Sequence, residues 1–156
     1  MVVINIYGVP GSQKFKFLSS MYSVLACNDK DCSIIGDFNV DLTKNMFSIT
    51  GEIVDRLDRA KHSDMVVMNT PILLQAIYYR QMDLPEPDMF EIIAYKLYQR
   101  YTNVNVLIED PSNSYLYRDI KDMLNKYGIE YETVKSITDS HYATLLNEYL
   151  RSCESL

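Results

Sequence analysis

A short stretch near the N-terminus contains the residues best suited to chemistry. It runs GVPGSQKF, from Gly8 to Phe15, with Lys14 as its only cation. The spacing approaches G-x-x-x-x-G-K-[ST], the pattern of a loop whose backbone N–H groups and lysine hold phosphate. Gln13 stands where the pattern has its second glycine, and Phe15 stands where it has a hydroxyl. The chemistry indicated is therefore phosphate binding by an altered loop.

Both departures affect groups that phosphate binding uses. The second glycine lets the backbone curve closely around phosphate oxygens, often with a positive φ. Gln13 has a long side chain that can occupy that space itself. The hydroxyl of the pattern binds Mg²⁺, which a phenyl ring such as that of Phe15 cannot do. Gly8, Gly11, Ser12 and Lys14 are the residues that keep the pattern.

The elements that would position this loop follow from the hydrophobic pattern. Short apolar runs, rich in β-branched residues, predict buried strands. They lie at Val2 to Tyr7, Cys32 to Gly36, Asp64 to Met68, Val104 to Ile108 and Ile129 to Val134. Helical spacing predicts helices at Lys14 to Ala26, Thr50 to Ala60, Ile72 to Met82, Asp88 to Tyr101, Ser114 to Tyr127 and Asp139 to Leu150. Within the fourth helix, the pattern places Phe90, Ile93, Leu97 and Tyr101 on one stripe.

Strands and helices alternate, and the strand sequences are continuous apolar runs. This arrangement predicts an α/β fold in which helices cover both faces of a parallel sheet. The length of 156 residues predicts one domain that spans residues 1–156. Ligands of such folds bind at the carboxyl ends of the strands. The loops after Tyr7, Ile35, Met68 and Ile108 are therefore the places where a site is expected.

Composition narrows the classes of function. The net charge is −6 and the chain has no basic run, which argues against nucleic acid as a partner. An acidic mimic of nucleic acid ranks last among our hypotheses, because acidic and basic residues are interleaved. Three cysteines at these spacings fit neither a metal site nor a disulfide framework, which predicts a reducing, cytoplasmic compartment. We expect neither a signal peptide nor a membrane span.

Four blocks of sequence together resemble a known family. They are INIYGVPGSQK, IGDFNVDLTK, DMVVMNTPILLQAIYY and YTNVNVLIED. In order and spacing they resemble the small phage-encoded AAA-type ATPase or nucleotide-kinase-like P-loop NTPase family, over most of the chain. The resemblance implies a three-layer nucleotide-kinase-like fold with a five-stranded parallel sheet. It further implies that the first strand is central and that the third and fourth strands flank it.

Comparison with the family pattern exposes further departures. The family's third strand ends in an aspartate beside serine and proline, where this chain has Asn69, whose amide offers no charge to Mg²⁺. The family carries an arginine-containing lid after its fourth strand, but Glu109 and Asp110 here lead almost directly into a helix. Asp37 follows the second strand as the family's acidic residue does. It either holds a hydroxyl or base edge, or caps a turn.

Phosphoryl transfer depends on positioning and charge neutralisation, so these combined losses favour a catalytically inactive protein without a cofactor. The nucleotide-binding residues would then be vestigial: Gly8, Gly11, Ser12, Gln13, Lys14, Phe15, Asp37 and Asn69. We expect such a protein, if phage-encoded, to bind a host or phage protein in the host cytoplasm. Tyr and Met are favoured at interfaces, and the candidate contacts are Tyr78, Tyr79, Met82, Met89, Tyr115 and Tyr117. The alternative for these residues is packing in the core, and the alternative partner is a second copy of the chain in a two-fold homodimer. The alternative function is that of a nucleotide-binding protein or weak kinase that uses ATP and Mg²⁺.

Overall fold

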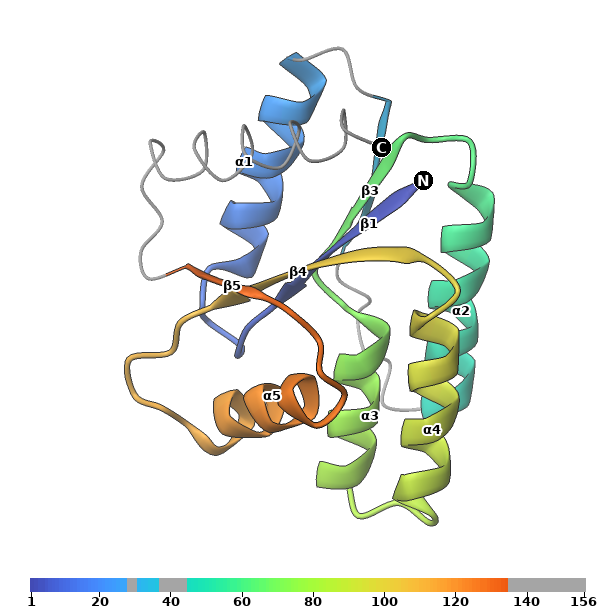
Figure 1. Ribbon diagram of the computed structural model, residues 1–156, viewed down its shortest axis with the longest axis vertical. Coiled ribbons are helices and arrows are strands. Elements are labelled where there is room, and N and C mark those ends of the chain that lie inside the picture. The colour runs from blue at the N-terminus through green and yellow to red at the C-terminus, as the bar shows by residue number, and fades with distance from the viewer. Residues whose placement is uncertain (28–30, 37–44, 135–156) are drawn as a thin grey trace.

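The sheet has the predicted parallel arrangement. The computed structural model describes residues 1–27, 31–36 and 45–134, and for Phe15 and Cys27 it describes the backbone alone. Five strands lie in the order β2-β3-β1-β4-β5, and all four neighbouring pairs are parallel. Figure 1 shows β1 in the middle of the sheet, between β3 and β4. The prediction of a central first strand is therefore confirmed.

The strands are short and largely buried. They are β1 (Val2–Tyr7), β2 (Cys32–Ile35), β3 (Met65–Met68), β4 (Thr102–Ile108) and β5 (Glu132–Val134). The first four contain no charged residue, so they can lie between two layers of helices without burying a charge. β1 pairs along its whole length with β4, from Val2 opposite Thr102 to Tyr7 opposite Leu107. This register brings the carboxyl ends of β1 and β4 together.

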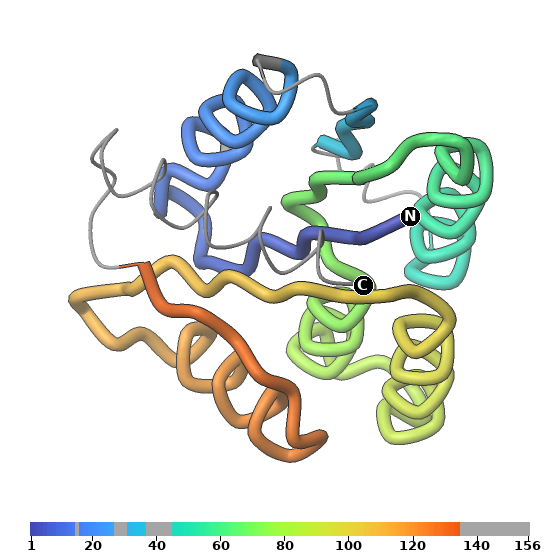
Figure 2. Tube along the Cα trace, turned by 45° about the horizontal axis from the view of Figure 1, so that its top comes forward, coloured from blue at the N-terminus to red at the C-terminus, as the bar shows by residue number. Residues whose placement is uncertain are grey.

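The helices pack on the sheet as two separate cores. They are α1 (Lys14–Cys27), α2 (Met46–Arg59), α3 (Ile72–Gln81), α4 (Pro87–Tyr98) and α5 (Tyr115–Lys126). Of these, α1 packs on the side of β1 that presents Ile4 and Ile6. The other four pack on the side that presents Val3 and Tyr7 (Figure 2). None of the described helices is both long and apolar enough to cross a bilayer.

Local capping explains two boundaries that differ from prediction. α2 begins four residues before the expected Thr50, because the side chain of Asn45 accepts a hydrogen bond from the Ser48 N–H at 2.8 Å and so caps it. β5 begins at Glu132 rather than Ile129, because Ile129 closes the preceding helix. Its N–H donates to the Leu124 carbonyl at 2.9 Å, across Gly128 with φ +61°. The predicted helix at Asp139 to Leu150 lies outside the described residues, as does Asp37.

The buried face of α4 also differs from the predicted stripe. Phe90, Glu91, Ala94 and Tyr98 are buried, whereas Ile93 is exposed. The predicted stripe was wrong in part because α4 is apolar on two sides, so that spacing alone does not distinguish the inner side from the outer. α4 ends at Tyr98, and Tyr101 lies beyond it.

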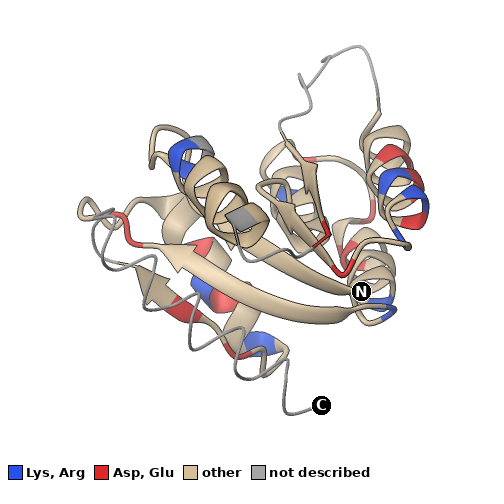
Figure 3. Ribbon diagram, turned by 90° about the horizontal axis from the view of Figure 1, so that it is seen from above, with Lys and Arg blue, Asp and Glu red and all other residues tan. Residues whose placement is uncertain are grey.

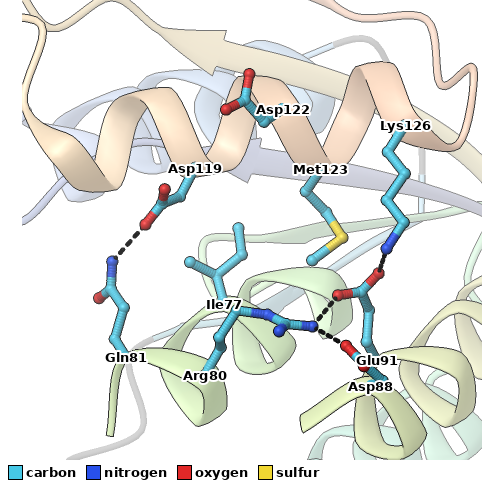
Figure 4. A pocket seen from close by; sticks show the side chains of 9 residues that line it. All are labelled: Ile77, Arg80, Gln81, Asp88, Glu91, Asp119, Asp122, Met123 and Lys126. Atoms are coloured by element: carbon cyan, nitrogen blue, oxygen red, sulfur yellow. Dashed lines mark hydrogen bonds and ion pairs between the residues drawn. The ribbon is translucent and has the colours of Figure 1, made fainter. Parts of the chain in front are cut away.

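A buried carboxylate ties α4 to its neighbours. We name Arg80, Glu91, Lys126 and Tyr127 the Glu91 cluster. One oxygen of Glu91 accepts from Arg80 at 2.9 Å, and the other accepts from Lys126 at 2.5 Å and from the Tyr127 hydroxyl at 2.8 Å. Figure 4 shows Arg80 reaching Glu91 from α3 and Lys126 reaching it from α5, across a hollow of about 440 Å³. The cluster therefore joins three helices through one buried charge.

Glu91 should make stability depend on pH. Burial alone would raise the pKa of Glu91, but hydrogen bonds from Lys126, Tyr127 and Arg80 outweigh burial and lower this pKa below its ordinary value of 4.5. As the pH falls, the unfolded chain takes up this proton first. The stabilisation by Glu91 is thus fully present above about pH 4.5 and is lost below it. Urea unfolding between about pH 7 and pH 3 should show a steeper acid loss of stability in wild type than in Glu91→Gln. Equal slopes would contradict this prediction.

Candidate functional site

The loop between β1 and α1 lies where a phosphate loop would lie, at the carboxyl end of the central strand. The Ser12 N–H donates to the Val9 carbonyl at 3.1 Å, with Pro10 and Gly11 between them. Gly11 has φ +80°, so these four residues have the pattern of a type II turn. The Ser12 N–H is therefore hydrogen-bonded within the loop. In a loop that holds phosphate, such an N–H group would face the ligand instead.

Gly8 allows the loop to lie close to β4. A Cβ atom at this position would stand 2.6 Å from Ser12 Oγ and 3.4 Å from Ile108 Cβ. The Ser12 hydroxyl is buried and has no hydrogen-bond partner among the described residues. The loop is thus tightly packed around its own first glycine, with Ser12 folded toward it.

Gln13 has a left-handed backbone conformation, as is typical of the glycine that the phosphate-loop pattern has at this position. Its φ is +63°, in the left-handed region that a residue with a Cβ atom adopts at a cost of about 1 kcal/mol. The residue is exposed, and its carbonyl accepts the first helical hydrogen bond of α1, from Phe17 at 3.0 Å. Gln13 therefore has the positive φ that the phosphate-loop pattern assigns to a glycine, although it carries a side chain. The structure describes the backbone of Phe15 in the first turn of α1.

Lys14 lies against the end of β3. Its Nζ donates to the backbone carbonyl of Asn69 at 3.4 Å, and Asn69 is buried. The N–H of Asn69 in turn donates to the Ile35 carbonyl at 3.4 Å. The structure thus brings together Lys14 and Asn69, two of the predicted site residues, at the carboxyl edge of the sheet. Since Asn69 is an amide, position 69 offers Mg²⁺ or its waters no carboxylate.

A hollow of about 510 Å³ opens beside the loop. It lies between the loop and the connection from β4 to α5, and the described residues around it include two carboxylates and no lysine or arginine. They are Val9, Pro10, Gly11, Ser12, Glu109, Asp110, Pro111, Ser112, Ser114 and Leu116. A hollow of this composition repels an anionic phosphate chain.

Asp110 is committed to the turn that begins α5. Its carboxylate accepts hydrogen bonds from the backbone N–H groups of Ser112 and Ser114, each at 3.0 Å, and from the Ser112 hydroxyl at 2.7 Å. Hydrogen bonds from Ser114 and Ser112 hold the pKa of Asp110 far below its ordinary range. The carboxylate is therefore ionised at neutral pH, which keeps the hollow acidic.

The connection between β4 and α5 has no room for a lid. Only residues 109–114 join Ile108 to Tyr115. The nearest arginine in sequence, Arg118, lies over the ring of Tyr115 with its guanidinium carbon 4.5 Å from the ring centroid. Tyr115 is 80% exposed at the beginning of α5. An aromatic ring with a stacked arginine thus projects from the helix that begins at this connection.

The candidate contact residues divide between core and surface. Tyr79 and Tyr117 are buried, and Tyr78 is partly buried. Tyr79 stacks on the ring of Phe90 with centroids 4.2 Å apart, and its hydroxyl donates to the Pro85 carbonyl. Met82, Met89 and Tyr115 remain exposed and accessible to a partner.

Charge is mixed over the surface. In the view of Figure 3, lysine and arginine lie beside aspartate and glutamate along the helices. Among residues 1–27, 31–36 and 45–134, no group of three or more His, Cys, Asp or Glu side chains is arranged to hold a metal ion.

Comparisons with known proteins identify the fold. No protein-family model matches the chain, and no curated protein sequence matches it. A crystal structure of thymidylate kinase from Ehrlichia chaffeensis superposes with a TM-score of 0.65 at 12% identity, over 96% of this chain and 98% of that one. A designed protein with the P-loop NTPase fold superposes with a TM-score of 0.56 at 10% identity, over 99% and 92% of the two chains. The chain therefore has the fold of P-loop NTPases and nucleotide kinases.

Sequence reasoning missed two features near α4. One is the Glu91 cluster, whose donors come from residues 80, 126 and 127 and converge only in the folded chain. The other is the apolar outer side of α4, at Met89, Ile92 and Ile93. The i, i+3, i+4 spacing of these three residues was a signal that could have revealed that side.

Proposed function

We propose that this P-loop-fold protein does not transfer phosphate and acts by binding another protein. The observation that carries the proposal is the acidic hollow beside the loop, where Glu109 and Asp110 lie and where the described residues supply no cation. Phosphoryl transfer needs charge neutralisation at that end of the sheet. Here the hollow at that end is lined by two carboxylates, Glu109 and Asp110.

The residues that remain do not fit Mg-ATP. Gln13 brings a side chain to the position of a glycine, Phe15 has no hydroxyl, and Asn69 has no charge. The turn formed by Val9 to Ser12 uses an N–H group that the phosphates would need. Each loss weakens a different part of the site, so together they support loss of catalysis better than an adjustment of it.

The same hollow suits a basic residue of a protein partner. A lysine or arginine side chain would meet Glu109 and Asp110, while exposed Tyr115 nearby offers a ring for packing or stacking. The sequence resemblance to phage-encoded proteins leads us to propose a host protein as the partner. Nucleotide binding is the second candidate, favoured by Lys14 at its pattern position and by the buried hydroxyl of Ser12 beside it.

Calorimetric titration with Mg-ATP separates the two candidates. We expect the wild type to bind ATP more weakly than about 1 mM, equivalent to about −4 kcal/mol, and to hydrolyse none. The variant Gln13→Gly, Phe15→Thr, Asn69→Asp should bind more tightly, because it restores the close backbone approach and both Mg²⁺ groups. Micromolar binding by the wild type that is lost in Lys14→Ala would overturn the proposal in favour of the nucleotide-binding alternative.

Affinity capture from host extract provides the protein arm of the test. Proteins retained by the wild type should be lost with Glu109→Lys and with Tyr115→Ala. Tyr22→Ala is the matched control, since Tyr22 is also an exposed tyrosine but belongs to α1, on the opposite face of the sheet. Capture that is indifferent to both hollow variants would reject this end of the sheet as the binding surface.

A further inference from the structure

α4 is apolar on the side that it turns to solvent. Met89, Ile92 and Ile93 have the i, i+3, i+4 spacing of one helix face, and Met89 and Ile92 are 54% and 53% exposed. The opposite side of the helix is already packed in the core through Phe90 and Ala94. α4 lies beside α3 (Figure 1), yet Met89, Ile92 and Ile93 are exposed, so the described elements leave this second apolar side open.

A residue of α2 extends the apolar surface. Phe47 is 52% exposed and stands edge-on to Phe90, with ring centroids 4.9 Å apart. We name Phe47, Met89, Ile92 and Ile93 the α4 face. Exposed apolar side chains that gather on neighbouring elements mark interaction surfaces, whereas single ones do not.

Charges of opposite sign stand at the two ends of this face. Asp88 and Lys96 lie four residues before and four residues after Ile92, so the three form one row along the helix. The Asp88 side chain is 83% exposed, while Arg80 holds it from α3 at 2.6 Å. Lys96 is exposed at the other end of the row. The row therefore runs from an exposed carboxylate, which Arg80 also contacts, through an apolar side chain to an ammonium group.

We propose that the α4 face pairs with the α4 face of a second copy of the chain, antiparallel about a two-fold axis at Ile92. In that arrangement Asp88 of each copy lies opposite Lys96 of the other. Met89 meets Ile93 of the other copy with an offset of about 3 Å along the axis. A row with this sequence of charges complements itself, as a two-fold interface requires. The interface lies apart from the acidic hollow beside the β1–α1 loop, since no α4 residue lines that hollow. This proposal therefore goes beyond the proposed function.

Sedimentation equilibrium of the full chain at about 100 µM tests the dimer. The wild type should be dimeric, and Ile92→Glu should weaken association at least about a hundredfold, because it places two carboxylates at the two-fold axis. Tyr22→Glu, an exposed residue on the other face of the sheet, should leave association unchanged. Thermal melts of all three proteins check the fold. A monomeric wild type, or a dimer that tolerates Ile92→Glu, would overturn the proposal.

Charge reversal tests the antiparallel register. Lys96→Glu alone and Asp88→Lys alone should each weaken the dimer roughly tenfold, because each places like charges opposite one another twice. An equal mixture of the two variants should restore association, since both contacts then join opposite charges. A mixture that associates no better than its components would reject this register.

Discussion

A variant that carries both Arg80→Met and Lys126→Met should lose about 3–5 kcal/mol of unfolding free energy. Arg80 and Lys126 donate to different oxygens of Glu91, and both cations are partly exposed while Glu91 is buried. The double substitution leaves the carboxylate in the interior with the Tyr127 hydroxyl as its remaining described donor. A buried charge that loses its ionic partners lowers the unfolding free energy far more than the loss of an ion pair at the surface does.

Removal of the carboxylate itself should cost less. In Glu91→Ala the two cations can turn toward water, so we expect a loss of about 2 kcal/mol. Adding Glu91→Met to the double variant should recover most of the loss, because replacing a whole buried ionic cluster by apolar groups is often nearly neutral. Arg59→Met is the matched control, since Arg59 pairs with Asp55 at an exposed site, where about 0.5 kcal/mol is expected.

Urea unfolding at neutral pH, followed by circular dichroism, gives these free energies. The order of stability is the test: the double variant should lie below Glu91→Ala, and the triple variant above both. If the double variant and Glu91→Ala lose the same free energy, Glu91 does not behave as a desolvated charge. In that case the Glu91 cluster would contribute little beyond its individual hydrogen bonds.

The sheet was predictable because its signals are local. Short apolar runs predicted all five strands, and helical spacing predicted α5. The central position of β1 came from the sequence resemblance, since no local pattern specifies strand order. The strand interiors were less predictable. Asn5 lies in β1, Asn103 and Asn105 lie in β4, and the Asn5 amide donates to Asn103 at 3.0 Å and to Asn105 at 3.3 Å across the β1–β4 pair.

The position of the candidate site could be predicted from the sequence, but its backbone conformation and local charge could not. Spacing located the loop and identified Gln13 as one of its two departures from the pattern, but the left-handed backbone of Gln13 is evident only in the fold. The acidity of the hollow depends on the β1–β4 register, which brings Glu109 and Asp110 beside a loop about a hundred residues earlier in the chain. Contacts at such separation leave no periodic signal in the sequence.

Phe90→Ala should destabilise the protein by about 3–5 kcal/mol. Phe90 is almost completely buried, and its ring contacts two others that also contact each other. It stacks on Tyr79 at 4.2 Å and receives Phe47 edge-on at 4.9 Å, so it joins α4 to both α3 and α2. Truncation leaves a cavity that the neighbouring rings cannot fill without losing their own contacts.

Phe47→Ala is the control for this prediction. The Phe47 ring contacts the same aromatic group, but it is half exposed, so we expect a loss of about 1 kcal/mol. Chemical unfolding of the two single variants and of the double variant also gives the coupling between the rings. A positive coupling of about 0.5–1.5 kcal/mol is expected for an edge-to-face pair. Equal losses in the two single variants would contradict the burial of Phe90. They would also contradict the orientation of α4, which buries Phe90 and exposes Met89, Ile92 and Ile93.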